Sequence, residues 1–370
     1  MVIDSRKKIL LIDNSIAFTG ALKSAIQEAG LFSGQFEFIF VIPEKNTVQD
    51  KIISSGFRIY PIPMIEISRS WKNILLYIPC LIINYFRLRK IVEKERVDII
   101  QVNDFYNLLG AMLKIFGFKG KLITYVRFLP STLPKVLRQT WTWIARKYSY
   151  RVICVSDAVK KQMPEKENII RIYNPVSLEE KYNETASTEK IKLLYPANYI
   201  LGKGQGYALE AFDVAYKKNQ NLKLKFVGGD MGLEKNRNKK KDLIKRASEL
   251  RIGDVVEFAE FASNVEKEIR ESDIVLNFSK AESFSMTCLE ASFYGRPVIA
   301  TRCGGPEEII DHNKTGLLVK NMDVEEMTNA ILELAKDKEK RIQFGIAGRK
   351  YVQAKFNADN FKKELGQVFS

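Results

Sequence analysis

Short apolar runs alternate with segments of helical periodicity along most of the chain. The runs are found at residues 9–12, 97–102, 122–126, 152–156, 274–278 and 298–301. They contain few charged residues, which is typical of strands in a parallel sheet that helices cover on both faces. Strands that alternate with helices in this way predict an α/β protein.

The segment 274–301 carries the most informative pattern. A buried strand is expected at 274–278, and the apolar spacing within 286–293 predicts a helix that follows it. Glu282 lies in the short connection between these two elements. We therefore expect Glu282 at the carboxyl end of a parallel strand, which is where open α/β sheets bind ligands.

Two carboxylates and a helix start predict a nucleotide-sugar site in this segment. The main-chain N–H groups of Ser285, Met286 and Thr287 would open the helix and attract a phosphate. Glu290 lies one turn further along, and both Glu282 and Glu290 could accept hydrogen bonds from vicinal hydroxyls of a sugar. The alternative is that the two glutamates form a solvated helix face, but the surrounding pattern favours the site.

The segment 282–319 resembles the retaining glycosyltransferases of family 4. The matching residues are Glu282-Ser-Phe-Ser285, Glu290-Ala291, Gly295–Ala300, Gly304-Gly305, Glu308–Ile310 and Thr315–Val319. The resemblance implies the GT-B fold, in which two Rossmann-like, doubly wound domains face each other across a cleft. It also implies that Glu282 binds the donor hexose, that Glu290 binds the ribose, and that Phe284 belongs to the donor site. Ser285 stands where the family usually has glycine.

A second motif, Tyr195–Gly204, resembles the strand end at which the family grips the donor diphosphate. The resemblance places Lys203 on the leaving phosphate. Asn198 stands where the family has an arginine, so one of the two phosphate cations is replaced by an amide. Gly228 ends a further expected strand, and the loop after that strand resembles part of the nucleobase pocket.

The amino-terminal half resembles the family more diffusely. Gly20, just before an expected helix, is the candidate for main-chain approach to the phosphates. Asn103 and Arg127 follow two expected strands where many members of the family have a histidine, and they are the acceptor-side candidates. The sole histidine, His312, lies in an expected turn, which argues against a mechanism with a histidine base.

The resemblance implies a retaining mechanism in which the leaving diphosphate helps to remove the acceptor proton. Lys203 and Glu282 are then the catalytic residues, with no metal ion and no cofactor. The donor would be a UDP- or GDP-linked hexose, bound as a substrate.

The segment Gly202–Gly206 superficially suggests a phosphate-binding P-loop. We reject this interpretation because the segment lacks the spacing of the P-loop motif.

The length of 370 residues is sufficient for two domains with their own cores. We expect an acceptor-binding domain at 1–176, a linker at 177–190 and a donor-binding domain at 191–350. The remaining segment, 351–370, is expected to be a helix that packs back toward the first domain.

The net charge of +15 is concentrated in the amino-terminal half. Between Asp104 and Asp157 the chain has nine basic residues and no acidic one, and Trp141, Trp143, Tyr148 and Tyr150 interleave with them. Basic and aromatic residues together suit the surface of an anionic membrane. The same pattern could bind nucleic acid, but no nucleic-acid-binding motif accompanies it in the sequence. The remaining alternative is that the aromatic residues belong to the core and that the cations form a solvated face.

The four cysteines lack metal-ligand spacing and suit reduced thiols in a cytoplasmic protein. The longest apolar stretch, Ile74–Phe86, has 13 residues and is too short to cross a bilayer. We therefore expect a cytoplasmic glycosyltransferase that lies peripherally on the inner membrane face. It would transfer a hexose to a glycan or lipid-linked glycan in cell-surface polysaccharide synthesis. The alternatives are a non-catalytic nucleotide-sugar-binding subunit and a nucleotide-sugar epimerase.

Overall fold

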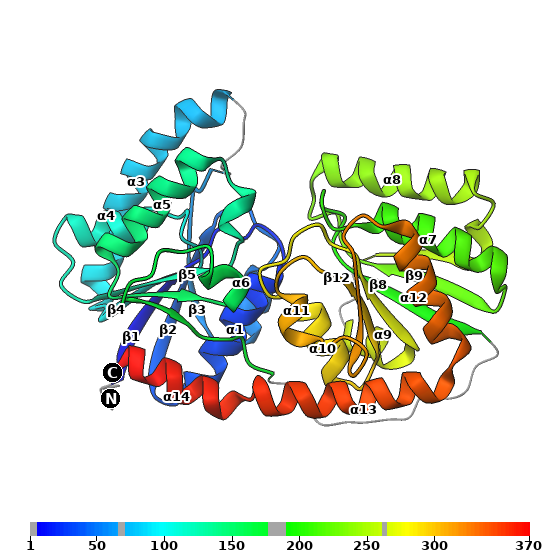
Figure 1. The fold of residues 1–370 in the computed structure, drawn as a ribbon. Helices are drawn as coiled ribbons and strands as arrows, with labels where there is room; N and C mark the ends of the chain where they lie inside the picture. Colours follow the sequence, from blue (N-terminus) through cyan, green and yellow to red (C-terminus); the bar gives the residue numbers. More distant parts are fainter. Residues whose placement is uncertain (1–5, 66–70, 177–189, 261–264) are drawn as a thin grey trace. The chain divides into compact units, whose positions relative to one another are not determined.

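The computed structural model describes residues 6–65, 71–176, 190–260 and 265–370 (Figure 1). The chain divides into two compact units. Unit 1 combines the residues up to 175 with 358–370, and unit 2 comprises residues 176–357. The expected linker at 177–190 lies outside the described residues except for its last position.

Within the described residues, unit 1 contains a sheet of seven parallel strands in the order β3-β2-β1-β4-β5-β6-β7. The strands are β1 (Lys7–Ile12), β2 (Phe36–Pro43), β3 (Arg58–Ile62), β4 (Ile99–Val102), β5 (Lys121–Val126), β6 (Arg151–Cys154) and β7 (Ile169–Arg171). The order reverses between β1 and β4, which makes the ends of these two strands the place where a ligand would bind.

Helices cover both faces of this sheet. They are α1 (Gly20–Phe32), α2 (Gln49–Ser54), α3 (Trp71–Glu95), α4 (Leu109–Ile115), the 3₁₀ turn η1 (Pro130–Thr132), α5 (Lys135–Tyr148), α6 (Asp157–Lys160) and α14 (Ala358–Phe369). Figure 1 shows α3, α4 and α5 together on one face. On the other face, Phe369 of α14 packs edge-on against Phe32 of α1 and Phe36 of β2.

Among the described residues, unit 2 contains six parallel strands in the order β10-β9-β8-β11-β12-β13. They are β8 (Ile191–Pro196), β9 (Leu222–Val227), β10 (Val256–Ala259), β11 (Ile274–Asn277), β12 (Val298–Thr301) and β13 (Gly316–Val319). Here the order reverses between β8 and β11. The prediction of an α/β protein is confirmed, and each of the six apolar runs overlaps a strand.

The helices of unit 2 also form two layers (Figure 1). They are α7 (Gln205–Lys218), α8 (Glu234–Glu249), the 3₁₀ turn η2 (Gly253–Val255), α9 (Val265–Glu271), α10 (Met286–Phe293), α11 (Pro306–Ile309), α12 (Val324–Lys336) and α13 (Lys338–Lys355). The predicted helix after Glu282 is α10. The segment 351–370 contains the end of α13 and all of α14, with Phe356 and Asn357 between them.

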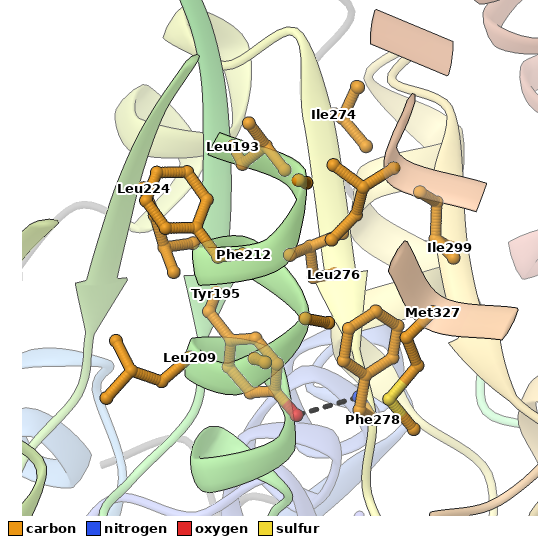
Figure 2. Close-up of a cluster of buried hydrophobic side chains, with 14 of the residues drawn as sticks. Leu193, Tyr195, Leu209, Phe212, Leu224, Ile274, Leu276, Phe278, Ile299 and Met327 are labelled. Atoms are coloured by element: carbon orange, nitrogen blue, oxygen red, sulfur yellow. Dashed lines mark hydrogen bonds between the residues drawn. The ribbon is translucent and has the colours of Figure 1, made fainter. Parts of the chain in front are cut away.

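The main core of unit 2 lies between its sheet and helices α7, α8 and α12. Figure 2 shows Phe212 of α7 among Leu193, Leu224 and Leu276 of three neighbouring strands. All four side chains are buried, so α7 packs directly on this face of the sheet. The rigid layer fixes the strand ends from which the site is built.

Candidate functional site

Two loops of unit 2 are held together at the reversal of strand order. The hydroxyl of Tyr195 donates a hydrogen bond to the carbonyl of Lys203, at 2.5 Å, and accepts one from the N–H of Phe278, at 2.7 Å (Figure 2). Gly204 has a φ of +75°, and a Cβ there would lie 1.9 Å from the carbonyl oxygen of Phe278. This close backbone contact therefore requires glycine at position 204. It places Lys203 beside the loop that follows β11.

The two residues predicted to be catalytic form an ion pair. The Lys203 Nζ lies 2.7 Å from Oε1 of Glu282, and the Ser279 hydroxyl donates to the same oxygen at 2.8 Å. The main chain of Glu282 donates to the carbonyl of Cys303 and accepts from the N–H of Gly305. Lys203 and Ser279 thus hold the carboxylate, the loop after β12 holds the main chain of Glu282, and the positive charge of Lys203 is balanced by its partner.

Ser285 begins helix α10 in an unusual conformation. Its φ of +83° lies in the left-handed region that favours glycine. The Ser285 Oγ accepts hydrogen bonds from the Cys288 N–H, at 3.3 Å, and from the Asn277 side chain, at 2.8 Å. The serine therefore caps the helix and ties it to β11. The N–H groups of Met286 and Thr287 have no partner within the helix, so they suit an anionic ligand.

The other predicted donor-site residues of this segment differ in exposure. Glu290 is buried, at 6% exposure, one turn inside α10. The ring of Phe284 is 2% exposed and packs edge-on against Phe356, with 5.4 Å between centroids. The Phe284 side chain therefore belongs to the core. The predicted donor contact is left to the main chain of Phe284. The Thr287 hydroxyl donates to the carbonyl of Pro196 and joins α10 to the end of β8.

Asn198 and Gly228 lie where the ends of β8 and β9 approach each other closely. The Asn198 Oδ1 accepts a hydrogen bond from the Gly229 N–H at 3.0 Å. A Cβ on Gly228 would lie 2.0 Å from the carbonyl oxygen of Ala197. The ends of β8 and β9 therefore approach too closely for a side chain at position 228. Asn198 shapes this junction but brings no charge to it.

Lys239 of α8 is a residue that the sequence analysis missed. Its Nζ donates to the carbonyl of Ile200, at 2.6 Å, and to Oε1 of Gln205, at 2.9 Å. The Gln205 side chain in turn donates to the carbonyl of Asn198 at 2.9 Å. Burial, and then the positive charge of Lys203, lower the pKa of Lys239 to about 8. Within the run of three lysines at 239–241, nothing in the sequence distinguished this one from its neighbours.

The predicted residues of unit 1 meet where β1 and β4 end. The Asn103 side chain donates to the Asp13 carboxylate and, at 3.3 Å, to the carbonyl of Ala21. Its Oδ1 accepts from Nε of Arg127 at 2.6 Å. Gly20 is the exposed first residue of α1, next to Ala21. The structure therefore brings Gly20, Asn103 and Arg127 together.

The guanidinium of Arg127 is buried by its partners. It donates to the Asn174 side chain at 2.8 Å, forms an ion pair with Glu28 at 3.4 Å and stacks over the Tyr125 ring at 4.1 Å. Burial raises the pKa of Glu28, and the charge of Arg127 opposes that rise. The Arg127 side chain therefore joins the strand ends of unit 1 internally, and its acceptor-side role stays a prediction.

Asp104 follows Asn103 directly after β4 and is not among the predicted site residues. Its Oδ1 accepts hydrogen bonds from the N–H groups of Phe105, at 2.9 Å, and Arg127, at 3.3 Å. Burial raises the pKa of Asp104 to about 7, with a further contribution from the charge of Asp13. An acidic side chain that titrates near neutrality lies at the ligand-binding edge of the unit 1 sheet.

Three further observations concern the histidine, metal binding and membrane spans. The Nδ1 of His312 accepts a hydrogen bond from the Leu318 N–H at 3.0 Å, which gives the histidine a role in the turn before β13. In the described part of the chain, no group of three or more His, Cys, Asp or Glu side chains is arranged to hold a metal ion. None of the described helices combines the length and apolar composition needed to span a bilayer.

Two family models match most of the chain between them. The model described as Glycosyl transferases group 1 matches residues 177–351. The model described as Glycosyltransferase Family 4 matches residues 55–180. The first model contains the whole of the unit 2 site, from Asn198 to Glu290.

Individual proteins show the same likeness. An uncharacterized glycosyltransferase of Haemophilus influenzae is 26% identical over 268 residues, which are 71% of this chain and 74% of that protein. A GDP-mannose-dependent alpha-(1-6)-phosphatidylinositol monomannoside mannosyltransferase of Mycobacterium tuberculosis is 39% identical over 84 residues, 23% of this chain and 22% of that protein. The crystal structure of Anabaena HepE in complex with UDP and glucose superposes with a TM-score of 0.82, at 17% identity, over 98% of this chain and 99% of that one. This likeness confirms the GT-B fold.

The buried ion pair of unit 1 generates a prediction about stability. Replacing Arg127 with methionine should lower the free energy of unfolding by about 3–5 kcal/mol, because Glu28 would be left buried without its counter-charge. Urea denaturation followed by circular dichroism measures this change. The double variant Arg127→Met, Glu28→Gln should recover part of the loss. Arg89→Met, whose guanidinium pairs with Glu93 on the surface, is the matched control and should resemble the parent. Parent-like stability of Arg127→Met would contradict the structural role.

Asp104 predicts how stability depends on pH. The pKa is about 7 in the folded state, above the roughly 3.9 of an unfolded aspartate, so the folded state holds the proton more tightly. The stabilisation is complete below about pH 4 and is lost as the pH rises through 7. In Asp104→Asn, the melting temperature should therefore fall less than in the parent between pH 5 and 8. Asp359→Asn, on the surface of α14, serves as the control, and identical profiles for Asp104→Asn and the parent would refute the prediction.

Proposed function

The chain belongs to the glycosyltransferases of group 1 and family 4, and we propose that it is a retaining hexosyltransferase with a nucleotide-sugar donor. The acceptor in this proposal is a glycan or a lipid-linked glycan, and the product contributes to a cell-surface polysaccharide. The reaction uses no metal ion and no cofactor. UDP and GDP are the candidate carriers, since one similar structure contains UDP and one relative depends on GDP-mannose.

The observation that carries the proposal is the convergence of Lys203, Glu282 and the start of α10 at the ends of β8 and β11. A diphosphate over the start of α10 would receive hydrogen bonds from the N–H groups of Met286 and Thr287. The Lys203 ammonium would oppose the charge that grows on the leaving phosphate. Glu282 would accept a hydrogen bond from a hexose hydroxyl, and Glu290 from the ribose.

The proposed reaction proceeds on one face of the sugar. The bond between the anomeric carbon and the diphosphate oxygen breaks, and the acceptor hydroxyl oxygen forms the new bond from the same side. The acceptor proton passes to the departing phosphate oxygen, so no histidine or other protein base is needed. The residues of the chain orient the donor and stabilise charge on the leaving group.

Two departures from the family pattern keep a second function open. Asn198 replaces the expected arginine, and Ser285 replaces the expected glycine. A nucleotide-sugar-binding subunit without transferase activity would bind the donor but release no nucleoside diphosphate. An epimerase would convert the donor without any acceptor. Turnover measured with and without a lipid-linked acceptor separates these alternatives from transfer.

An anionic membrane is the proposed location of the acceptor, and α3 supplies the first observation in favour. Six large apolar side chains on the outer side of this helix are 46–65% exposed: Leu75, Leu76, Ile78, Ile82, Ile83 and Phe86. Their spacing places them within one stripe along the helix, opposite Leu88 and Ile91 in the core. Arg87, Arg89 and Lys90 follow the stripe directly. Apolar residues with flanking cations suit the interface of an anionic bilayer.

Helix α5 supplies the second observation. Val136 is 72% exposed and Trp143 is 47% exposed, whereas Trp141 is buried against Phe105. The Nζ of Lys147 lies 4.7 Å from the centre of the Trp143 ring. The aromatic residues of the basic segment are therefore divided between the core and the surface. Helix α5, which carries Trp143, lies on the same side of the unit 1 sheet as α3 (Figure 1).

The catalytic assignment predicts the effect of two substitutions. Lys203→Ala and Glu282→Ala should each lower turnover at least about tenfold, because each removes a charge-assisted contact worth about 1.5–3 kcal/mol. The assay measures transfer of radiolabelled hexose from UDP- and GDP-linked donors to a lipid extract. Lys241→Ala and Glu339→Ala change exposed residues of unit 2 and should leave turnover unchanged. Parent-like turnover in both site variants would place the active site elsewhere.

The membrane proposal predicts salt-dependent binding to vesicles. Replacing Lys135, Arg138, Arg146 and Lys147 with glutamine should weaken binding to phosphatidylglycerol vesicles at low salt by at least about 100-fold, since each cation contributes about 1 kcal/mol. Binding of the parent should weaken as salt rises because the charges are screened. Co-sedimentation measures both effects.

The control for this test changes charge to the same extent in unit 2, at Lys218, Lys223, Lys241 and Lys338. It should bind vesicles as the parent does. Substituting Ile78, Ile82 and Phe86 with serine should remove the binding that remains at high salt, because that part depends on apolar area. Equal binding of the parent and the glutamine variant at low salt would show that the cations are a solvated face.

A further inference from the structure

The charge balance of the unit 2 site is incomplete for a diphosphate. Lys203 is paired with Glu282 at 2.7 Å, so the two groups together contribute no net charge. Asn198 contributes an amide oxygen that is bonded to the Gly229 N–H. Lys203 and Glu282 therefore leave no excess positive charge for a multiply charged anion, and a further cation would supply it.

Lys239 is placed to supply that cation. Its Nζ donates at 2.6 Å to the Ile200 carbonyl, which also accepts the main-chain N–H of Lys203 at 3.2 Å. The second bond, to Gln205, links Lys239 to the side chain that holds the Asn198 carbonyl. Lys239 thus bonds directly to the middle of the loop from Asn198 to Lys203, and through Gln205 to its first residue. Two of its three ammonium hydrogens are used, and no third acceptor contacts it among the described residues.

We propose that Lys239 provides the second positive charge for the diphosphate of a nucleoside diphosphate or nucleotide sugar, in place of the cation that position 198 lacks. The inference rests on the proposed function and adds a residue from α8 to its donor site. A lysine held against a loop by two acceptors has a fixed position, so its charge acts at a defined distance from the ligand.

Electrostatics gives this proposal a measurable signature. In the free protein, Lys239 is partly deprotonated above pH 8 because burial and the charge of Lys203 disfavour its ammonium form. Two neighbouring cations of α8 are paired: Lys240 with Glu260, and Arg237 with Asp230. A bound diphosphate favours the ammonium form and raises the pKa of Lys239. Binding should therefore take up a proton between about pH 8 and 10.

The experiment is isothermal titration of the whole protein with UDP and GDP at pH 7, 8 and 9, in pairs of buffers with different ionisation enthalpies. For the parent, we expect affinity to fall as the pH rises above 8, with up to one proton taken up per nucleotide at pH 9. Lys239→Met should bind about 10- to 100-fold more weakly at pH 7 and take up no proton. Lys241→Met, two residues along the same helix and exposed, should match the parent.

Two further variants separate charge from a purely structural role of Lys239. Lys239→Arg should keep the affinity but lose the proton uptake, because arginine does not titrate in this range. Asn198→Arg in the Lys239→Met background should restore affinity, also without proton uptake. If Lys239 merely braced the loop, Lys239→Met would weaken uridine or guanosine as much as the diphosphates, and Asn198→Arg would not rescue it.

The outcomes also separate this inference from the proposed function. Binding of UDP or GDP with the same affinity and proton uptake in the parent and in Lys239→Met would overturn the role of Lys239 and leave the transferase proposal intact. Absence of binding by the parent to both nucleotides and to their hexose conjugates would overturn both proposals.

Discussion

The close approach of two loops in unit 2 is the constraint on which the candidate site depends. The hydroxyl of Tyr195 joins the carbonyl of Lys203 to the N–H of Phe278, and Gly204 permits the backbones to touch. These contacts are buried, so water does not compete for them. They place the Lys203–Glu282 ion pair at the reversal of strand order, before any ligand is present. A site whose charges are positioned by backbone contacts loses little conformational freedom when it binds.

Unit 1 has the strand order of unit 2 with one further strand, β7, at its edge, but it uses its polar groups differently. At the ends of β1 and β4, Asn103 and Arg127 bond to Asp13, Glu28 and other internal partners. These interactions satisfy buried polar groups and join neighbouring strands. In unit 2, by contrast, the first N–H groups of α10 have no helical partners and remain suited to an anion. The shared topology therefore defines two polar junctions with different chemical capacities.

Family membership restricts the chemistry of this chain to a class, and its own residues determine the detail within that class. Asn198 lowers the positive charge of the loop after β8, and Lys239 is attached to the same loop from α8. Ser285 adopts a conformation that favours glycine, but its hydroxyl caps α10 and binds Asn277. Asn198 and Ser285, which both depart from the family pattern, thus each form hydrogen bonds that stabilise the local structure. The exposed apolar stripe of α3 gives unit 1 a surface property that is independent of this site.

The sequence by itself determined the α/β class, the strands at its apolar runs, helix α10 and the residue types of the unit 2 site, because periodicity and motif spacing are local properties. Glu282 and Lys203 could be expected near one another because each follows a parallel strand. Tertiary structure decided which side chains are available to a ligand. The guanidinium of Arg127 is enclosed by partners up to 99 positions away in the chain, and Phe284 lies in the core. The Lys239 side chain, on helix α8, bonds to a loop that lies more than 30 residues earlier in the chain. Local sequence does not encode such a contact.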